Sequence, residues 1–208
     1  MACKCRLPLW PMLAAMISSL SVAGCLLPPS TTITTPLARS PAVIYTGIVV
    51  RPLLDSTSAG PDPKIGQRIM AETVTRLMQS GTFDYWHVAD TAILSHPTFF
   101  PFEREALVPL DSLLQLSENV VELAITLTEF DKGDAFTRYM FGYLSGGGAV
   151  AIRTRLIDRR YGHVVVAGDT RRTVRGGHAT VHSTIRPLAR ALTLFVDGNI
   201  RRLARMSE

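Results

Sequence analysis

The chain has 208 residues and a formal net charge of +5, from 22 Lys and Arg against 17 Asp and Glu. This length suits one domain with a short appended segment rather than several domains. The three cysteines are Cys3, Cys5 and Cys25, so the chain beyond residue 25 has no thiol for a disulfide, a zinc site or nucleophilic catalysis.

The N-terminal segment has the layout of a secretory signal peptide. Lys4 and Arg6 precede an apolar run from Leu7 to Val22, and small residues lead to Gly24 and Cys25. A membrane-spanning helix is the alternative, but the run is short for the ~20 residues that a span needs and prolines interrupt it. We therefore predict export, with cleavage between Gly24 and Cys25.

The sequence Val22-Ala23-Gly24-Cys25 resembles the cleavage site of bacterial lipoproteins. The resemblance implies that residues 1–24 are removed, that the Cys25 thiol carries a diacylglyceryl group and that the new amine is usually acylated. Two or three acyl chains, at about 0.8 kcal/mol per buried CH₂, anchor a protein without a span. In such lipoproteins an Asp after the cysteine typically retains the protein in the inner membrane, and here that residue is Leu26. The resemblance therefore implies that the protein is lipid-anchored in the cell outer membrane and faces the periplasm.

Residues 25–41 comprise the lipidated cysteine and a stretch rich in Pro and Thr. A segment of this composition buries too little apolar surface to fold, and its prolines keep it extended. We expect it to be a spacer and nothing more, followed by a single periplasmic domain over residues 42–208.

The sequence of the first part of the expected domain, residues 43–88, predicts a strand, a helix and a second strand. Val43–Leu53 is rich in the β-branched and aromatic residues that strands favour. Asp62 offers an N-cap with Pro63 at the first helical position, and apolar residues recur at helical spacing over Lys64–Ser80. Phe83–Val88 predicts the second strand.

The middle of the chain is less regular until Asn119. Residues 91–118 contain three prolines and predict only a short helix near Asp111–Leu116. From Asn119 onward, apolar residues alternate with Glu, Ala and Thr through Leu127, which is the pattern of a half-buried strand.

Two further strands follow a glycine-rich loop. Ala149–Asp158 places apolar residues on one face and Arg153 and Arg155 on the other. A turn then leads to Val164–Val174, so that three consecutive strands form an antiparallel meander. The carboxylate of Asp158, which precedes the turn, is expected to accept backbone hydrogen bonds there.

A long helix ends the chain. Apolar residues recur at helical spacing between Val181 and Leu203, with Pro187 in the first turns or at a kink. The complete pattern predicts an α+β fold, in which a mainly antiparallel sheet of about five strands carries two long helices on one face.

From about residue 120 to 177 the chain resembles a family of uncharacterised bacterial lipoprotein domains of unknown function. The shared features are a strand ending Thr128-Glu129-Phe130, an Arg138…Gly142…Gly146-Gly147-Gly148 loop, a strand ending Leu156-Ile157-Asp158, a Tyr161-Gly162 turn and Gly176-Gly177. More distantly, the topology resembles the periplasmic domains of curli-secretion and peptidoglycan-synthase-activating lipoproteins, and the lipoprotein auxiliary component of lipid ABC transport systems. None of these relatives is an enzyme, so the resemblance implies a non-catalytic role.

No motif in the sequence predicts catalysis. Gly142–Gly146 places Ser145 one residue out of register with the G-x-S-x-G nucleophile elbow. Gly146–Gly148 lacks the following Lys-Ser/Thr of a phosphate-binding loop, and a flexible connection is the simpler interpretation. His178 and His182 have a spacing that metal ligands use, but no carboxylate motif accompanies them. We predict no enzyme activity, no cofactor and no metal.

Charge is segregated along the chain. Residues 43–150 hold seven Lys and Arg against thirteen Asp and Glu, whereas residues 151–208 hold twelve Arg against four acids. The arginine fork suits bidentate contact with phosphate or carboxylate, so Arg153 and Arg155 are candidate residues for contact with a protein, anionic lipid or peptidoglycan. Nucleic acid is not expected for an exported protein. The alternative is a solvated basic face, partly paired with the acidic half.

The connection Phe136–Leu144 is unusually aromatic for a loop between strands. If exposed, it would form an apolar patch that contacts a protein or a membrane, and if folded back it would cap the core. Tyr85 and Trp86, by contrast, are expected to be core residues of their strand. The candidate interaction residues of the loop are Arg138, Tyr139, Met140, Phe141 and Tyr143.

These predictions describe an outer-membrane lipoprotein with a non-catalytic accessory or assembly domain. Its expected partner is an envelope protein, docked through the aromatic loop and the arginine face. The alternative is an auxiliary lipoprotein of an envelope lipid transport system. A deep apolar cavity between sheet and helices would favour lipid handling, whereas a filled core and a flat polar surface would favour protein docking.

Overall fold

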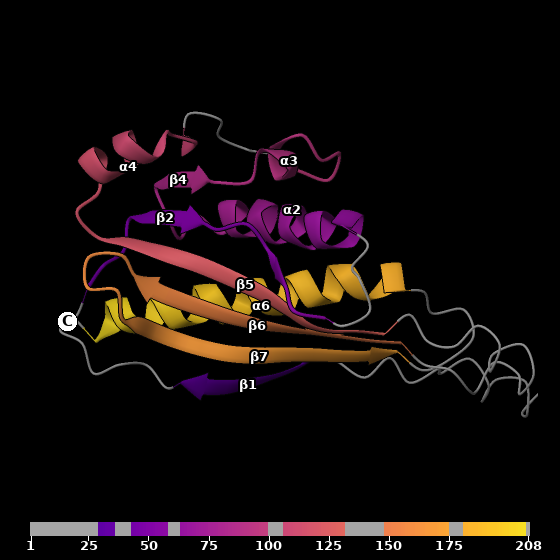
Figure 1. Cartoon of the computed structure of the whole chain (residues 1–208). Helices are drawn as coiled ribbons and strands as arrows, with labels where there is room; N and C mark the ends of the chain where they lie inside the picture. Colours follow the sequence, from indigo (N-terminus) through magenta and orange to yellow (C-terminus); the bar gives the residue numbers. More distant parts are fainter. Residues whose placement is uncertain are drawn as a thin grey trace, which may run out of the picture.

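A seven-stranded sheet and four helices make up the part of the chain that the computed structural model describes (Figure 1). The fold is α+β, as predicted, but the sheet has more than the expected five or so strands and mixes parallel with antiparallel pairs. The described residues are 29–35, 43–57, 63–99, 106–131, 148–174 and 181–206.

The sheet joins an antiparallel half to a parallel half. Its order is β1-β7-β6-β5-β2-β4, with β3 also paired to β5. β5 pairs antiparallel with β6, and a short turn over residues 159–163 favours the antiparallel pairing of β6 with β7. β2 and β4 are parallel because the chain returns between them through a helix. The strands are β1 (Ser30–Thr35), β2 (Gly47–Val50), β3 (Leu54–Asp55), β4 (Tyr85–Val88), β5 (Val120–Asp131), β6 (Gly148–Asp158) and β7 (Val164–Val174).

Helices cover both faces of the sheet. The two long helices, α2 (Pro63–Gln79) and α6 (Val181–Arg205), pack against each other on one face, as predicted. Pro187 lies within the first two turns of α6. The short helix α4 (Leu110–Leu116), close to its predicted bounds, covers the beginning of β5 and part of β2 on the opposite face, and α3 (Thr91–Leu94) contacts α2 and β4.

The main core fills the space between the sheet and the two long helices. Ile48 of β2, Leu123 of β5 and Ile152 of β6 are fully buried there against Val74 of α2 and Leu192 of α6. A smaller cluster beneath α4 lies on the other face of the sheet. Alternation along the strands separates the two clusters, since successive side chains point to opposite faces.

β5 is more buried than its sequence predicts. The half-buried pattern required Glu122 and Ala124 to face solvent, but each is 5% exposed. β5 is an interior strand with β2 and β6 as neighbours, and α4 covers the start of its second face. Side chains of both faces are therefore enclosed over its first six residues.

Part of the expected spacer is a strand. β1 pairs antiparallel with β7, in the register Thr31 to Thr170. The prediction of a spacer and nothing more is therefore wrong for these six residues. The segment is rich in β-branched threonine and contains no proline, so it can complete a ladder at the otherwise open edge of β7.

Candidate interaction site

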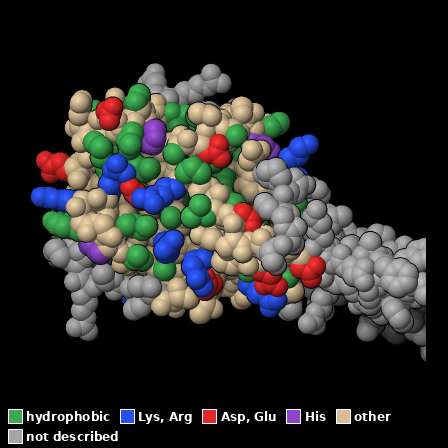
Figure 2. All heavy atoms as spheres, viewed as in Figure 1, with side chains coloured by type: hydrophobic (Ala, Val, Ile, Leu, Met, Phe, Trp, Pro, Cys, Tyr) green, Lys and Arg blue, Asp and Glu red, His purple; other side chains and the backbone are tan. Residues whose placement is uncertain are grey.

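The face of β5, β6 and β7 turned away from α6 is a candidate interaction surface, which we call the open face. Alternation along β6 places Arg153 and Arg155 on this face and Ile152 and Leu156 in the core, as predicted. Figure 2 looks onto the open face and shows Lys and Arg side chains beside Asp and Glu. The charged residues that define it are Glu122, Glu129, Arg153, Arg155, Asp169 and Arg171.

Two bidentate ion pairs order the open face. Arg153 lies opposite Asp169 on β7 and donates from Nε and Nη2 to its two carboxylate oxygens, at 2.8 and 3.2 Å. Arg171 reaches across the small side chain of Ala151 and donates to Glu129 of β5, with both distances 2.8 Å. The hydrogen bonds from Arg171 lower the pKa of the Glu129 carboxyl. Both arginine side chains stay more than half exposed, so each keeps a surface for a partner.

Two further ion pairs share the buried carboxylate of Glu122. The Glu122 side chain, 7% exposed, pairs with Arg51 through one carboxylate oxygen and accepts a hydrogen bond from Arg159 through the other. A buried carboxylate without such partners would be strongly destabilising. The cluster therefore ties the end of β2 and the β6–β7 turn to the middle of the sheet.

Arg155 differs from its neighbours on the open face. Its cross-strand positions are Ala124 and Ala167, which carry no charge. Among the described residues it forms no ion pair and is half-buried. Within the described ranges, Arg155 is the arginine of the open face whose guanidinium forms no ion pair with a carboxylate of the same chain.

A buried tyrosine and aspartate pair lies at the end of β6. Asp158 accepts a hydrogen bond from the Tyr161 backbone N–H at 2.9 Å, which confirms its predicted role in the turn. It also accepts one from the Tyr45 hydroxyl at 2.7 Å, which the sequence did not predict. Burial, and then the hydrogen bond to Asp158, raise the pKa of Tyr45.

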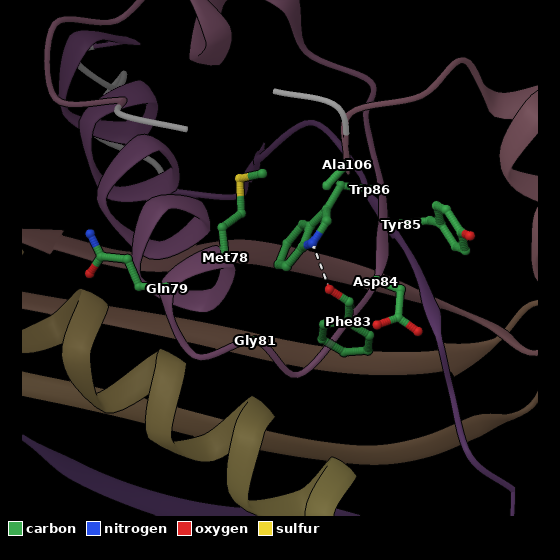
Figure 3. A pocket seen from close by; sticks show the side chains of 8 residues that line it. All are labelled: Met78, Gln79, Gly81, Phe83, Asp84, Tyr85, Trp86 and Ala106. Atoms are coloured by element: carbon green, nitrogen blue, oxygen red, sulfur yellow. Dashed lines mark hydrogen bonds between the residues drawn. The ribbon is translucent and has the colours of Figure 1, made fainter. Parts of the chain in front are cut away.

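A pocket of about 820 Å³ lies between the end of α2 and β4 (Figure 3). Trp86 lies in its wall but is only 1% exposed. Its indole N–H donates to the Phe83 carbonyl at 3.2 Å, and its ring meets that of Phe83 edge-on. Trp86 is thus a core residue, as predicted, while Tyr85 is half-buried. Asp84 is the only charged side chain among the described residues of the lining, which therefore offers no acid–base pair.

A groove of about 700 Å³ separates β1 from α6, and we call it the β1–α6 groove. Arg172 of β7 lies in it and is 6% exposed. The sequence did not predict this groove because the residues of β1 were expected to be a spacer. Its lining is Pro29, Thr31, Ile33, Arg172, Pro187, Arg190, Ala191, Leu194 and Phe195.

Several predicted site residues lie outside the described residues. These include the cleavage and lipidation positions Gly24 and Cys25, and also Ser145 and His178. Within the described ranges, no group of three or more His, Cys, Asp and Glu side chains could hold a metal ion, and no helix is long and apolar enough to cross a membrane. The loop residues Arg138, Tyr139, Met140, Phe141 and Tyr143 also lie outside.

No protein-family model and no curated protein matches the sequence. Among solved structures, a PelC dodecamer from Paraburkholderia phytofirmans is similar at 16% identity and a TM-score of 0.49, over 79% of this chain and 95% of that one. Lipoprotein GNA1162 from Neisseria meningitidis is 21% identical, with a TM-score of 0.43, over 74% and 99%.

Protein XCC0632 from Xanthomonas campestris, of the DUF330 family, is similar at 15% identity and a TM-score of 0.38, over 86% of this chain and 93% of that one. These neighbours are bacterial proteins, one of them a lipoprotein by name. At these identities and scores the likeness assigns no activity or partner to the chain.

Proposed function

We propose that this chain is a lipid-anchored, non-catalytic accessory protein of the bacterial outer membrane, whose open face docks an envelope protein. The observation that carries the proposal is the arrangement of arginines on that face. Arg155 has no carboxylate partner among the described residues. It lies two residues from Arg153 on the same face of β6, and Arg153 is held in a bidentate ion pair. An acidic protein surface is the complementary partner.

The fixed orientation of the arginine side chains on the open face supports docking. Side chains that must be immobilised at an interface cost about 0.5–1.5 kcal/mol each, and Arg153 and Arg171 are already oriented by their ion pairs. Exposed charges of this kind contribute more to association rate and specificity than to affinity. A face with oriented guanidinium groups therefore suits selective docking.

The filled core argues against a carrier that encloses lipid between sheet and helices. Ile48, Leu123 and Leu192 are fully buried where such a cavity would have to lie. An auxiliary lipoprotein of an envelope lipid transport system is the second candidate function. The β1–α6 groove is the observation that favours it, because its walls are largely apolar.

Site-directed photo-crosslinking in the native host tests the docking proposal. A photoreactive residue in place of Thr126, which lies opposite Arg153 on the open face, should capture one envelope protein, identifiable by mass spectrometry. The same residue in place of exposed Gln79 on α2 is the matched control and should capture none.

The charge of Arg155 provides the second arm of that experiment. Arg155→Glu should lower the crosslink yield about tenfold, because like charges then face each other at the interface. Arg202→Glu, on the exposed side of α6, changes net charge equally and should have no effect. Equal capture from Thr126 and Gln79, or a yield unchanged by Arg155→Glu, contradicts docking through the open face.

A further inference from the structure

The β1–α6 groove exposes apolar side chains from two elements that face each other. Ile33 of β1 is 50% exposed and Leu194 of α6 is 63% exposed, although both are large and apolar. Pro187 and Ala191 continue the same stripe of α6, two turns and one turn before Leu194 respectively. Exposed apolar surface that converges on a groove indicates a site of contact with an apolar group.

Arg172 places a cation in that groove, and no ion pair to it is found among the described residues. Its side chain is 6% exposed, and its buried Nε atom has no hydrogen-bond partner. Burial lowers the pKa of Arg172, but an arginine stays charged in a protein. Because a buried charge is costly unless paired, the geometry calls for an anion beside Arg172.

The described residues that line the groove include no acidic side chain to fill that role. Arg190 adds a second cation from α6, and no Asp or Glu is among the described residues that line the groove. Arginine donors match phosphate oxygens in bidentate geometry. Two guanidinium groups beside apolar walls are complementary to an amphiphile with an anionic phosphate head.

The proposed lipid anchor would hold the groove close to a membrane. Pro29 lines the groove and follows Cys25 by four residues, a length of chain that spans at most about 14 Å. This step rests on the lipid anchor of the proposed function. It limits the available phosphate amphiphiles to those of the leaflet in which the anchor is inserted.

We propose that the β1–α6 groove binds an acidic phospholipid of that leaflet, with the phosphate on Arg172 and Arg190 and an acyl chain along Ile33 and Leu194. The acyl chains of Cys25 itself are the other occupants within reach, but they carry no anion and would leave Arg172 unpaired. Binding would also fix the orientation of the domain, because it turns the β1 edge of the sheet toward the membrane.

Native mass spectrometry of the full-length protein, extracted from membranes in mild detergent, tests the proposal. Wild-type protein should retain phospholipid, and Arg172→Gln should lower the retained amount about tenfold through loss of charge-assisted hydrogen bonds. Arg202→Gln, an exposed residue of the same helix as Arg190, is the matched control and should retain as much as wild type. Equal retention by wild type and Arg172→Gln overturns the proposal.

A titration of the delipidated protein identifies the chemistry of the ligand. Phosphatidylglycerol should bind with at least about tenfold higher affinity than phosphatidylcholine, because two cations and no anion are among the described residues that line the site. Inorganic phosphate should not displace it, because phosphate cannot occupy the apolar walls. No preference between the two lipids, or displacement by millimolar phosphate, overturns the proposal.

A second variant keeps the test valid if Arg172→Gln does not fold. Leu194→Glu changes an exposed side chain at the groove and should abolish phosphatidylglycerol binding while leaving the circular dichroism spectrum unchanged. Undiminished binding to this folded variant contradicts the groove as the site. The intact mass of the same sample reports acylation of Cys25 separately, so a missing anchor and an empty groove give different results.

Discussion

At the scale of single residues, the buried contact between Tyr45 and Asp158 joins two distant parts of the chain. Both side chains are less than 5% exposed, and the hydroxyl donates to the carboxylate at 2.7 Å. The sequence predicted that Asp158 would accept a backbone hydrogen bond in its turn, because that contact is local. Tyr45, 113 residues earlier, could not be assigned as a partner from local pattern.

Tyr45→Phe should destabilise the protein by about 1.5–3 kcal/mol, since it removes a hydrogen bond to a charged, buried group. Urea denaturation followed by circular dichroism measures the change. Tyr161→Phe is the control, because Tyr161 is 65% exposed and should change the free energy of unfolding by less than about 0.5 kcal/mol. Equal stability of wild type and Tyr45→Phe contradicts the importance of this hydrogen bond.

The raised pKa of Tyr45 predicts the direction of a pH effect. The folded state holds the phenolic proton more tightly than the unfolded state, whose tyrosine pKa is about 10. This contribution to stability is complete below that pH and is lost as pH rises above it. Thermal melting from pH 8 to 11 should show a steeper fall for wild type than for Tyr45→Phe, and parallel curves would contradict the assignment.

At the scale of elements, α6 and β7 approach each other at Gly168. A Cβ atom at this position would lie 2.6 Å from Phe195 Cε2 and 3.1 Å from the Thr32 carbonyl of β1. The glycine thus allows the ring of Phe195, which also lines the β1–α6 groove, to rest against the strand. Pattern alone did not indicate this, since glycine in a strand has several interpretations.

Gly168→Ala should cost roughly 1–3 kcal/mol, because the added methyl group forces the Phe195 ring away from β7. The free energy of unfolding measured in urea tests this. Gly198→Ala on α6 is the control, since a Cβ there meets nothing within 4 Å, and it should be neutral or slightly stabilising. A neutral Gly168→Ala would show that α6 is not held against β7 at this point.

β1 shows why local sequence pattern predicts a spacer where the structure has a strand. Its Pro- and Thr-rich surroundings predict an extended spacer, and an extended chain is also what a strand requires. Whether such a chain is solvated or paired depends on a free sheet edge, and the edge of β7 lies more than 130 residues away. The strands of the β5–β6–β7 meander were predicted correctly, since their pairing partners are consecutive.

At the scale of the whole molecule, charge segregation along the chain becomes charge pairing in space. Arg159 and Arg171, from the basic half of the sequence, pair with Glu122 and Glu129 from the acidic half. Within the described part of the chain, the basic half of the sequence is therefore partly paired with the acidic half. Arg155 and Arg172 are unpaired exceptions among the described residues, on opposite faces of the sheet, and each carries one of the proposals above.

Cys25→Ser should release the whole molecule from the membrane, because it removes the site of the acyl chains. The measurement is fractionation of membranes and soluble material, together with metabolic labelling by a fatty acid. Loss of label with release from membranes is expected. A Cys25→Ser protein that remains membrane-bound contradicts the lipid anchor, irrespective of any phospholipid in the groove.

Local sequence patterns were sufficient to predict both long helices, the three-strand meander and the alternation that puts Arg153 and Arg155 on the face opposite the core. These features depend on the spacing of side chains along a few turns or strand pairs. The pairing of β1, the burial of Glu122 and the position of Arg172, whose Nε atom has no partner among the described residues, follow from tertiary contacts alone. Each depends on contacts between residues far apart in the chain, which no local pattern encodes.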